Sequence, residues 1–248
     1  MTAIHTIAEA SLALRQKRLT VVELLEQCLD RIDVWEDSIG AWVHIDREHT
    51  RHQAQQKDME LKNGYCRGPL HGIPLGIKDI IDVKSIPTRA GSRVFPERPV
   101  SEITDAAVIE RLRHAGALFL GKSVTTEFAC FDPPETRNPW NVNHTPGGSS
   151  SGSAAAVAAG MCLAAIGSQT GGSITRPAAF CGVAGAKPSL GRVPCTGVVP
   201  ISEHLDHPGP LARSVTDLAT MLDVLSGHDP DDRVPVGFRT ATTFDYEQ

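Results

Sequence analysis

A run of glycine and serine between Pro146 and Gly160 has the residue types of a loop that handles negative charge. It reads PGGSSSGSAAAVAAG, and its alanines form helix readily. A Gly/Ser loop that opens a helix offers backbone N–H groups and the positive end of the helix dipole to an anion or to developing negative charge. The Gly-Lys-Ser/Thr ending of a P-loop and the GxGxxG of a dinucleotide site are missing. A flexible linker is the alternative, but the helix-forming alanines favour a loop that serves another electrophile or an oxyanion.

A second glycine-rich turn, residues 167 to 180, follows about one βα unit later. Its sequence, GSQTGGSITRPAAF, contains two glycines that allow a close backbone approach to a substrate carbonyl and a proline that suits the first turn of a helix. The N–H groups of the turn could form an oxyanion hole, worth on the order of 3 kcal/mol per donor. They belong to Thr170, Gly171, Gly172 and Ser173. An ordinary glycine turn is the alternative for this segment on its own.

A serine nucleophile needs a base, and Lys78 is the best candidate. None of the ten histidines lies inside either glycine-rich segment, and the nearest, His144, is interpreted as a loop residue. Lys78 stands in an otherwise apolar strand, GIPLGIKDII, where lysine is rare unless it is functional or at an exposed end. Burial would lower the lysine pKa from about 10.4 toward 7, and Asp79 should then point to the other side of the strand. A solvated strand-end lysine is the alternative.

The other histidines and the cysteines indicate no metal site. His204 and His207 form an HxxH pair, but no third ligand is near them and Pro-Gly-Pro follows as a turn. The six cysteines are far apart and include no CxxC, which is atypical of a disulfide scaffold or a zinc knuckle and favours a reducing cytoplasm. We therefore expect no metal and no other cofactor.

The elements that must position these segments predict an α/β fold. A capping box at Thr20 and Glu23 opens a helix, and residues 49 to 62 read as a solvated helix. Residues 1–60 are therefore expected to form a helical segment that packs on the core. After residue 64, a helix followed by a short apolar strand recurs, and such alternation indicates a layered α/β architecture.

Six further elements are expected after residue 64. They are a strand with its exit at 73–83, a helix capped by Thr104 or Asp105 and running to His114 before a strand at 117–120, a helix at 154–160 before a strand at 161–166, and a helix from a capping box at 214–217 to Gly227. Beyond Asp229 the chain turns polar and loses periodicity.

Taken together, residues 72–83, 147–160 and 167–182 resemble the amidase signature family. Three motifs in the same order, with one lysine and two serines at matching positions, are far more specific than the GGSSSGS run alone. The likeness extends from about residue 5 to residue 232 and includes the stretches GKSVTTEFA, RNPWN, KPSLGRV and LDHPGPLARSV. The resemblance implies a mixed central sheet wrapped by helices.

By this resemblance the catalytic group is a Ser–Ser–Lys triad. Ser173 is the nucleophile that forms an acyl-enzyme, Ser149 is the bridging serine preceded by a cis peptide bond, and Lys78 is the base. The resemblance further implies that neutral Lys78 draws a proton through Ser149 from Ser173 while the turn N–H groups hold the oxyanion. The neighbouring serines are interpreted as structural, through cap and loop hydrogen bonds: Ser150, Ser151 and Ser153.

The nucleophile turn departs from the commonest family pattern in a way that bears on the substrate. Many members carry aspartate where this chain has Gln169, and the pattern QTGGSxxRP resembles the malonamidase-like branch. In that branch the arginine three residues after the nucleophile, here Arg176, holds a substrate carboxylate, a task suited to bidentate pairing. This favours a small amide with a carboxylate, such as a malonamate- or allophanate-like compound. A structural ion pair at a helix start is the alternative.

Composition and charge restrict the class of partner. The chain has 248 residues, 41% of them hydrophobic, and a net charge of −5 from 24 basic and 29 acidic residues, as in a globular protein of one large domain or two small ones. Because the basic residues are scattered, we expect neither direct nucleic-acid binding nor a membrane patch. No apolar run could span a bilayer, and the N-terminus lacks the pattern of a signal peptide.

Length leaves three functions open. Family members are usually about twice as long, so residues 61–248 are expected to form a single amidase signature core without the family's second half, which a homodimer or a second chain could complete. An amidohydrolase that releases ammonia from a small-molecule amide is favoured. The alternatives are a partner-dependent or inactive amidase half and the glutaminase subunit of a tRNA-dependent amidotransferase.

Overall fold

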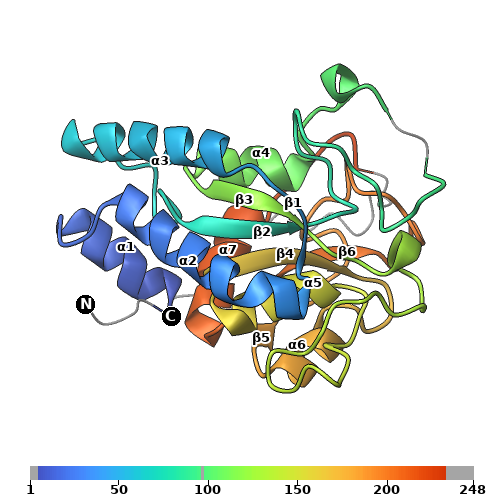
Figure 1. The fold of residues 1–248 in the computed structure, drawn as a ribbon. Helices are drawn as coiled ribbons and strands as arrows, with labels where there is room; N and C mark the ends of the chain where they lie inside the picture. The colour runs from blue at the N-terminus through green and yellow to red at the C-terminus, as the bar shows by residue number, and fades with distance from the viewer. Residues whose placement is uncertain (1–4, 96–97, 233–248) are drawn as a thin grey trace.

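A six-stranded mixed sheet forms the centre of the protein. The computed structural model describes residues 5–95 and 98–232 (Figure 1). The strands are β1 (Trp42–Ile45), β2 (Pro74–Lys78), β3 (Leu118–Ser123), β4 (Ala164–Gln169), β5 (Ala184–Gly185) and β6 (His207–Ala212), in the sheet order β1-β3-β2-β4-β6-β5. The central strands β3, β2 and β4 are parallel, whereas β1, β6 and β5 pair antiparallel with their neighbours. The expected α/β class with a mixed sheet is confirmed.

Seven α-helices and two short 3₁₀ helices surround the sheet within the described residues. The helices are α1 (Ile7–Arg15), α2 (Val21–Ile39), α3 (Arg47–Lys62), α4 (Ala107–His114), α5 (Ser151–Ala159), α6 (Thr175–Cys181) and α7 (Val215–Leu225), with single turns at Val100–Glu102 and Glu127–Ala129. Figure 1 shows α2 and α5 in front of the sheet and α4 and α7 behind it. No helix among the described residues has the length and apolarity needed to cross a membrane.

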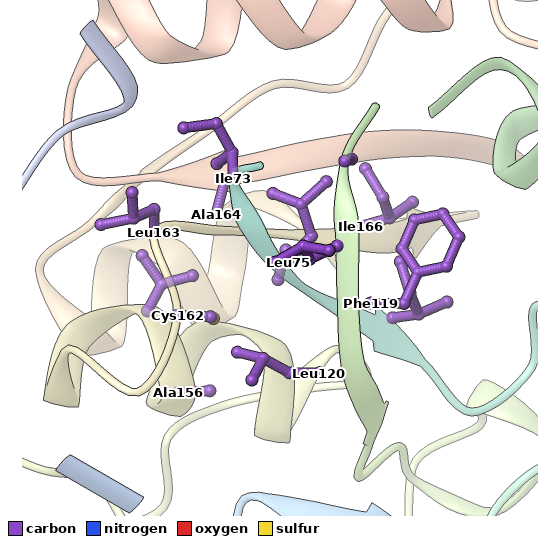
Figure 2. Close-up of a cluster of buried hydrophobic side chains, with 14 of the residues drawn as sticks. Ile73, Leu75, Phe119, Leu120, Ala156, Cys162, Leu163, Ala164 and Ile166 are labelled. Atoms are coloured by element: carbon purple, nitrogen blue, oxygen red, sulfur yellow. The ribbon is translucent and has the colours of Figure 1, made fainter. Parts of the chain in front are cut away.

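Alternation along the strands supplies the core between these layers. In Figure 2, Leu120 of β3 lies toward Ala156 of α5, whereas the neighbouring Phe119 points to the other side of the strand. Every residue of β2, β3 and β4 is buried, as expected for parallel strands covered on both faces. A polar side chain on these strands is therefore removed from water and needs a partner within the protein.

The local helix signals were correct where the cap is made by sequence neighbours. The Thr20 hydroxyl accepts from the Glu23 N–H at 3.1 Å and the Glu23 carboxylate accepts from the Thr20 N–H at 2.8 Å, which is the expected capping box. The predicted cap of α4 was wrong. The helix begins after Ala106 without a side-chain cap, because the Asp105 carboxylate instead accepts from the Arg113 guanidinium and the Lys84 N–H.

Two more elements differ from the sequence-based expectation. Residues 1–60 contain a strand, β1, that pairs with β3, so this segment is not helical throughout; its separation as a domain from 61–248 stays a prediction. At the start of α7 the Ser214 hydroxyl accepts from the Asp217 N–H at 3.0 Å, but the Asp217 carboxylate accepts from the N–H of Ala8 in α1 at 3.2 Å instead of completing the box. Of the polar stretch after Asp229, residues 233–248 lie outside the described part of the chain.

Candidate active site

Lys78 ends β2 in the interior of the protein, between two serine hydroxyls. Its side chain is 0% exposed, and Nζ donates to Ser149 Oγ at 2.6 Å and to Ser168 Oγ at 2.8 Å. Burial lowers the pKa of Lys78 to about 7, against an opposing effect of the Asp206 carboxylate. A neutral amine is therefore accessible near neutral pH, and its lone pair would face a serine hydroxyl.

A second buried lysine shows the contrast. Lys122 of β3 is also 0% exposed, but its Nζ lies 3.0 Å from the Asp79 carboxylate and donates to Thr88 Oγ1 at 2.9 Å. Asp79 is thus directed to Lys122 and away from the Lys78 amine, as the alternation of the strand predicts. Burial also lowers the pKa of Lys122, and the Asp79 carboxylate opposes that effect by direct contact. The hydrogen-bond partners of the Lys78 amine in the described chain are hydroxyls.

Ser149 is held by a loop whose other serines secure the backbone. The Gly148–Ser149 peptide bond is cis, as the family resemblance implied. Ser151 Oγ donates to the Gly147 carbonyl at 2.7 Å, Ser150 Oγ donates to the Ser168 carbonyl at 3.3 Å, and Ser153 Oγ lies 2.7 Å from Ser123 Oγ. These are loop contacts, and Ser150 stands at the N-cap of α5 without making a side-chain cap.

Ser173 lies beside this loop, in the turn between β4 and α6. The Ser150 N–H donates to the Ser173 carbonyl at 3.2 Å, which joins the two glycine-rich segments through the backbone. The Ser173 side chain is half-buried, and its hydroxyl has no hydrogen-bond partner in residues 5–95 and 98–232. Nothing in these contacts occupies the hydroxyl, so it is available to react.

The same turn leaves several backbone donors free. Within the described chain, the N–H groups of Thr170, Gly171, Gly172 and Ser173 have no acceptor. Thr170 also secures the turn, because its hydroxyl donates to the Asp206 carboxylate, which in turn accepts from the N–H groups of Ile201 and Ser202 at 2.7 and 2.9 Å. Four adjacent free donors form a suitable cradle for an oxyanion.

Arg176 stands at the start of α6 with an exposed side chain. A Cβ atom placed on Gly172 would lie 3.1 Å from an Arg176 guanidinium nitrogen, so the positive group lies over the nucleophile turn. No carboxylate of the described residues forms an ion pair with Arg176. The structural ion pair considered for this residue is therefore missing from that part of the chain, and the guanidinium can bind an external anion.

The histidines take no part in this cluster. His144 contributes its carbonyl to the Asn138 N–H at 2.9 Å and its side chain is exposed. His207 Nδ1 donates to the Leu205 carbonyl at 2.6 Å, which ties the ring to its own loop. Among residues with described positions, no group of three or more His, Cys, Asp or Glu could hold a metal ion.

Sequence reasoning missed Ser168 and Asp206 and gave Gln169 no structural role. Parallel pairing of β2 with β4 places Ile77 opposite Ile166, and this register brings the end of β4 beside Lys78. The available signal was that both strands end in polar residues. Without the register, that signal did not say which polar side chain would meet the lysine.

The segment RNPWN also has a positioning role that its sequence did not reveal. Asn138 Nδ2 donates to the Phe180 carbonyl at 2.9 Å and Trp140 Nε1 donates to the Cys181 carbonyl at 2.7 Å. These side chains satisfy carbonyls at the C-terminal end of α6. The loop that leads into the cis peptide is thereby fixed to the helix that follows Ser173.

Comparison with known families and proteins gives matches over most of the chain. The family model described as Amidase matches residues 23–245. A glutamyl-tRNA(Gln) amidotransferase subunit from Chloroflexus aggregans is 45% identical over 241 residues, which make up 94% of this chain and 49% of that protein. The corresponding protein of Geobacillus kaustophilus is 42% identical over 234 residues, 92% of this chain and 48% of its own.

Solved structures of amidases also match most of this chain. The native peptide amidase from Stenotrophomonas maltophilia superposes with a TM-score of 0.89 at 37% identity, over 98% of this chain and 52% of that enzyme. A structure described as an amidase has a TM-score of 0.84 at 42% identity, over 90% and 52%. The chain therefore spans about half the length of the curated relatives and solved structures that it matches.

Proposed function

Because the chain belongs to the Amidase family, as its three motifs indicated, we propose that it cleaves the C–N bond of an amide through Ser173, Ser149 and Lys78. The observation that carries the proposal is the fully buried Lys78 amine, 2.6 Å from Ser149 Oγ and hydrogen-bonded within the described chain to hydroxyls instead of a carboxylate. The match of the family model does not identify the reacting groups. That assignment rests on the geometry and on the residue-by-residue correspondence with the family motif.

The acylation step uses both serines. Ser173 Oγ attacks the amide carbon and its proton passes to Ser149 Oγ, while the Ser149 proton passes to the neutral Lys78 amine. The carbonyl oxygen becomes an oxyanion that the free N–H groups of the glycine turn stabilise. Lys78 is suited to this step because a base with a pKa near the working pH both accepts and returns a proton efficiently.

Collapse of the tetrahedral intermediate breaks the C–N bond. Ser149 gives a proton to the leaving nitrogen and recovers one from the Lys78 ammonium, so a primary amide releases ammonia and leaves an acyl group on Ser173. Water then attacks the acyl carbon through the same relay and regenerates the Ser173 hydroxyl. The protonated relay is needed because an amide anion is too basic to leave.

The position of Arg176 favours a substrate that carries a carboxylate. Its guanidinium is exposed at the nucleophile turn and meets no carboxylate of the described chain. A small amide whose acid group pairs with this guanidinium would present its carbonyl to Ser173, because bidentate pairing fixes orientation as well as position. Malonamate-like compounds carry both an amide and a carboxylate and so fit this description.

A second candidate function is the glutamine-hydrolysing role in an amidotransferase. It is favoured by the 45% identity to a glutamyl-tRNA(Gln) amidotransferase subunit, and glutamine is itself a primary amide with a carboxylate. In this function the ammonia would pass to a partner chain. Because the chain covers 49% of that relative, completion of the site by a second chain or a homodimer belongs to this proposal, as does a partner-dependent amidase half. The proposed cytoplasmic location agrees with six free cysteines.

An ammonia-release assay separates these functions. The chain is incubated with malonamate, glutamine and a neutral amide of similar size. Ser173→Ala is compared with a control variant, Ser101→Ala, which alters an exposed serine outside the glycine-rich segments. We expect Ser173→Ala to lower kcat/KM by a factor on the order of a thousand or more, and Arg176→Ala to raise KM for malonamate more than for the neutral amide. Parental activity in Ser173→Ala would refute the assignment. A clear preference for glutamine would favour the amidotransferase role.

A further inference from the structure

A groove lies between the end of α1 and the end of α3. It is lined on one side by the turn that leads from α1 to the start of α2, and on the other by the last turn of α3 and the residues that follow it (left in Figure 1). The cavity measures about 440 Å³, within the range of roughly 300–1,000 Å³ that small-molecule sites occupy. None of the residues proposed for catalysis lines it.

The floor of this groove contains three leucines. Leu14 of α1 and Leu19 of the following turn are buried, and Leu61 of α3 is half-buried against the main core. The hydrocarbon stems of long basic side chains at the rim add to this apolar surface. A ligand with a hydrocarbon part can therefore remove apolar surface from water by lying in the groove.

The rim of the groove is basic. Arg15, Lys17 and Lys62 line it with exposed side chains. Within the part of the chain that the structure describes, none of these three side chains makes an ion pair or a hydrogen bond. Arg15 and Lys62 stand in the last turns of their helices, where a cation also balances the negative end of the helix dipole. The rim thus offers positive charge to a ligand, although the whole chain has a net charge of −5.

Two features keep the rim positive. Asp58 is the acidic residue among the described lining, and its carboxylate already accepts from the Val21 N–H at 2.7 Å and the Val22 N–H at 3.2 Å. Lys17 has a left-handed backbone, with φ 57°, at the position after the C-cap of α1, where glycine is most common. The chain therefore carries a cation at this point in spite of the conformational cost.

We propose that this groove binds an amphipathic carboxylate, that is, a hydrocarbon chain or ring that carries one acid group. The hydrocarbon part covers the leucine floor, and the acid group pairs with the basic rim. An inorganic anion would leave the apolar floor in water, and a neutral or cationic apolar molecule would leave the rim without a partner. Charge complementarity and cavity size therefore select the same class of ligand. The site is separate from the proposed amide hydrolysis and does not depend on it.

Cys66 provides a reporter of ligand binding inside the groove. Cys66 is exposed and lines the cavity, whereas Cys130 is exposed and does not line it. The protein is treated with iodoacetamide at increasing concentrations of decanoate, and the alkylation rate of each cysteine is followed by peptide mass spectrometry. Because only the unliganded protein reacts at Cys66, decanoate at about ten times its Kd should slow this reaction about tenfold. The rate at Cys130, the internal control, should not change.

Two related compounds and two variants test the role of charge. Decanol and decylamine have the same chain without the acid group, so decanol should bind about tenfold more weakly than decanoate and decylamine should give no protection. Lys17→Gly removes one cation and relieves the left-handed backbone. Its Kd for decanoate should rise about threefold, while its Tm stays within a few degrees of the parent or above it. The matched control is Lys17→Arg, which keeps the charge and should keep the parental Kd.

Several results would overturn this inference and leave the proposed function intact. Absence of Cys66 protection by decanoate would do so, as would equal protection by decanol and decanoate. An unchanged Kd in Lys17→Gly would show that the rim plays no part in binding. A Cys66 rate that falls with protein concentration and does not respond to decanoate would show that a second copy of the chain covers the groove instead. Ammonia release, measured in parallel, should be the same in Lys17→Gly as in the parent.

Discussion

At the scale of single residues, the site depends on the different surroundings of two buried amines. Lys122 lies 3.0 Å from a carboxylate, whereas Lys78 contacts two hydroxyls. Desolvation destabilises the ammonium form of a lysine, and the Asp206 carboxylate offsets this only in part at Lys78. The lowered pKa of Lys78 therefore has two consequences. It reduces the free energy of unfolding when the amine is protonated, and it allows the amine to act as a base near neutral pH.

This linkage predicts how stability depends on pH. The pKa of Lys78 is about 7 in the folded protein and close to its usual value of 10.5 when unfolded. Between these values the unfolded state binds the extra proton, so the lysine destabilises the fold fully below pH 7 and progressively less as pH rises toward 10.5. Lys78→Met should therefore stabilise the protein most at pH 7 and below.

The expected size is measurable by urea denaturation. The stability gained in Lys78→Met should be smaller by about 2 kcal/mol at pH 9 than at pH 7. The comparison of two pH values within one pair of proteins cancels the loss of hydrogen bonds and the change in packing. A gain that is the same at both pH values would mean that Lys78 is charged in the folded protein and is not the base.

At the scale of elements, α5 approaches the sheet so closely that its first turn tolerates only glycine at one position. A Cβ on Gly152 would lie 2.2 Å from the Ala41 carbonyl oxygen and 2.4 Å from the Val124 nitrogen. Both are backbone atoms, and the Gly152 N–H donates to the Val124 carbonyl at 2.9 Å. The last glycine of GGSSSGS therefore sets the distance between the Ser149 loop and the end of β3.

Gly152→Ala should consequently destabilise the protein. Forcing the backbone apart costs about 1–3 kcal/mol, and each kcal/mol corresponds to a fall in Tm of about 2–4 °C for a domain of this size. The control is Gly171→Ala, where a Cβ meets nothing within 4 Å and the Tm should change by about 1 °C or less. Equal melting temperatures for the two variants would show that α5 can move away from the sheet without cost.

The sequence predicted elements whose signals are local and missed contacts that depend on register. The Thr20–Glu23 capping box needs only neighbours in the chain, and it forms. Asp105 and Asp217 carry equally good local signals, yet each bonds a group outside the predicted cap, Arg113 and Ala8 respectively. The pairing of Lys78 with Ser168 likewise follows from how β2 and β4 align, and no spacing within one segment encodes that alignment.

At the scale of the whole molecule, two ends of the described chain are fastened together around the sheet. Asp217 of α7 accepts from the Ala8 N–H in α1, and Arg213 Nη1 donates to the Val157 carbonyl of α5 at 2.7 Å. Lys78 lies at the end of β2, and Ser149 and Ser173 lie on the loops before α5 and α6, while helices cover both faces of the sheet (Figure 1). Family resemblance could predict this architecture, whereas the contact between Lys78 and Ser168 required the side-chain positions.

The central claim is that this assembly makes Ser173 a nucleophile, and covalent labelling tests it most directly. The chain is treated with a serine-directed sulfonyl fluoride between pH 6 and pH 9, and the modified residue is located by peptide mass spectrometry. The account predicts modification of Ser173 at a rate that rises through about pH 7, the pKa of Lys78, and that loses this pH dependence in Lys78→Met. Modification at another serine, or a Ser173 rate unaffected by Lys78→Met, would contradict it.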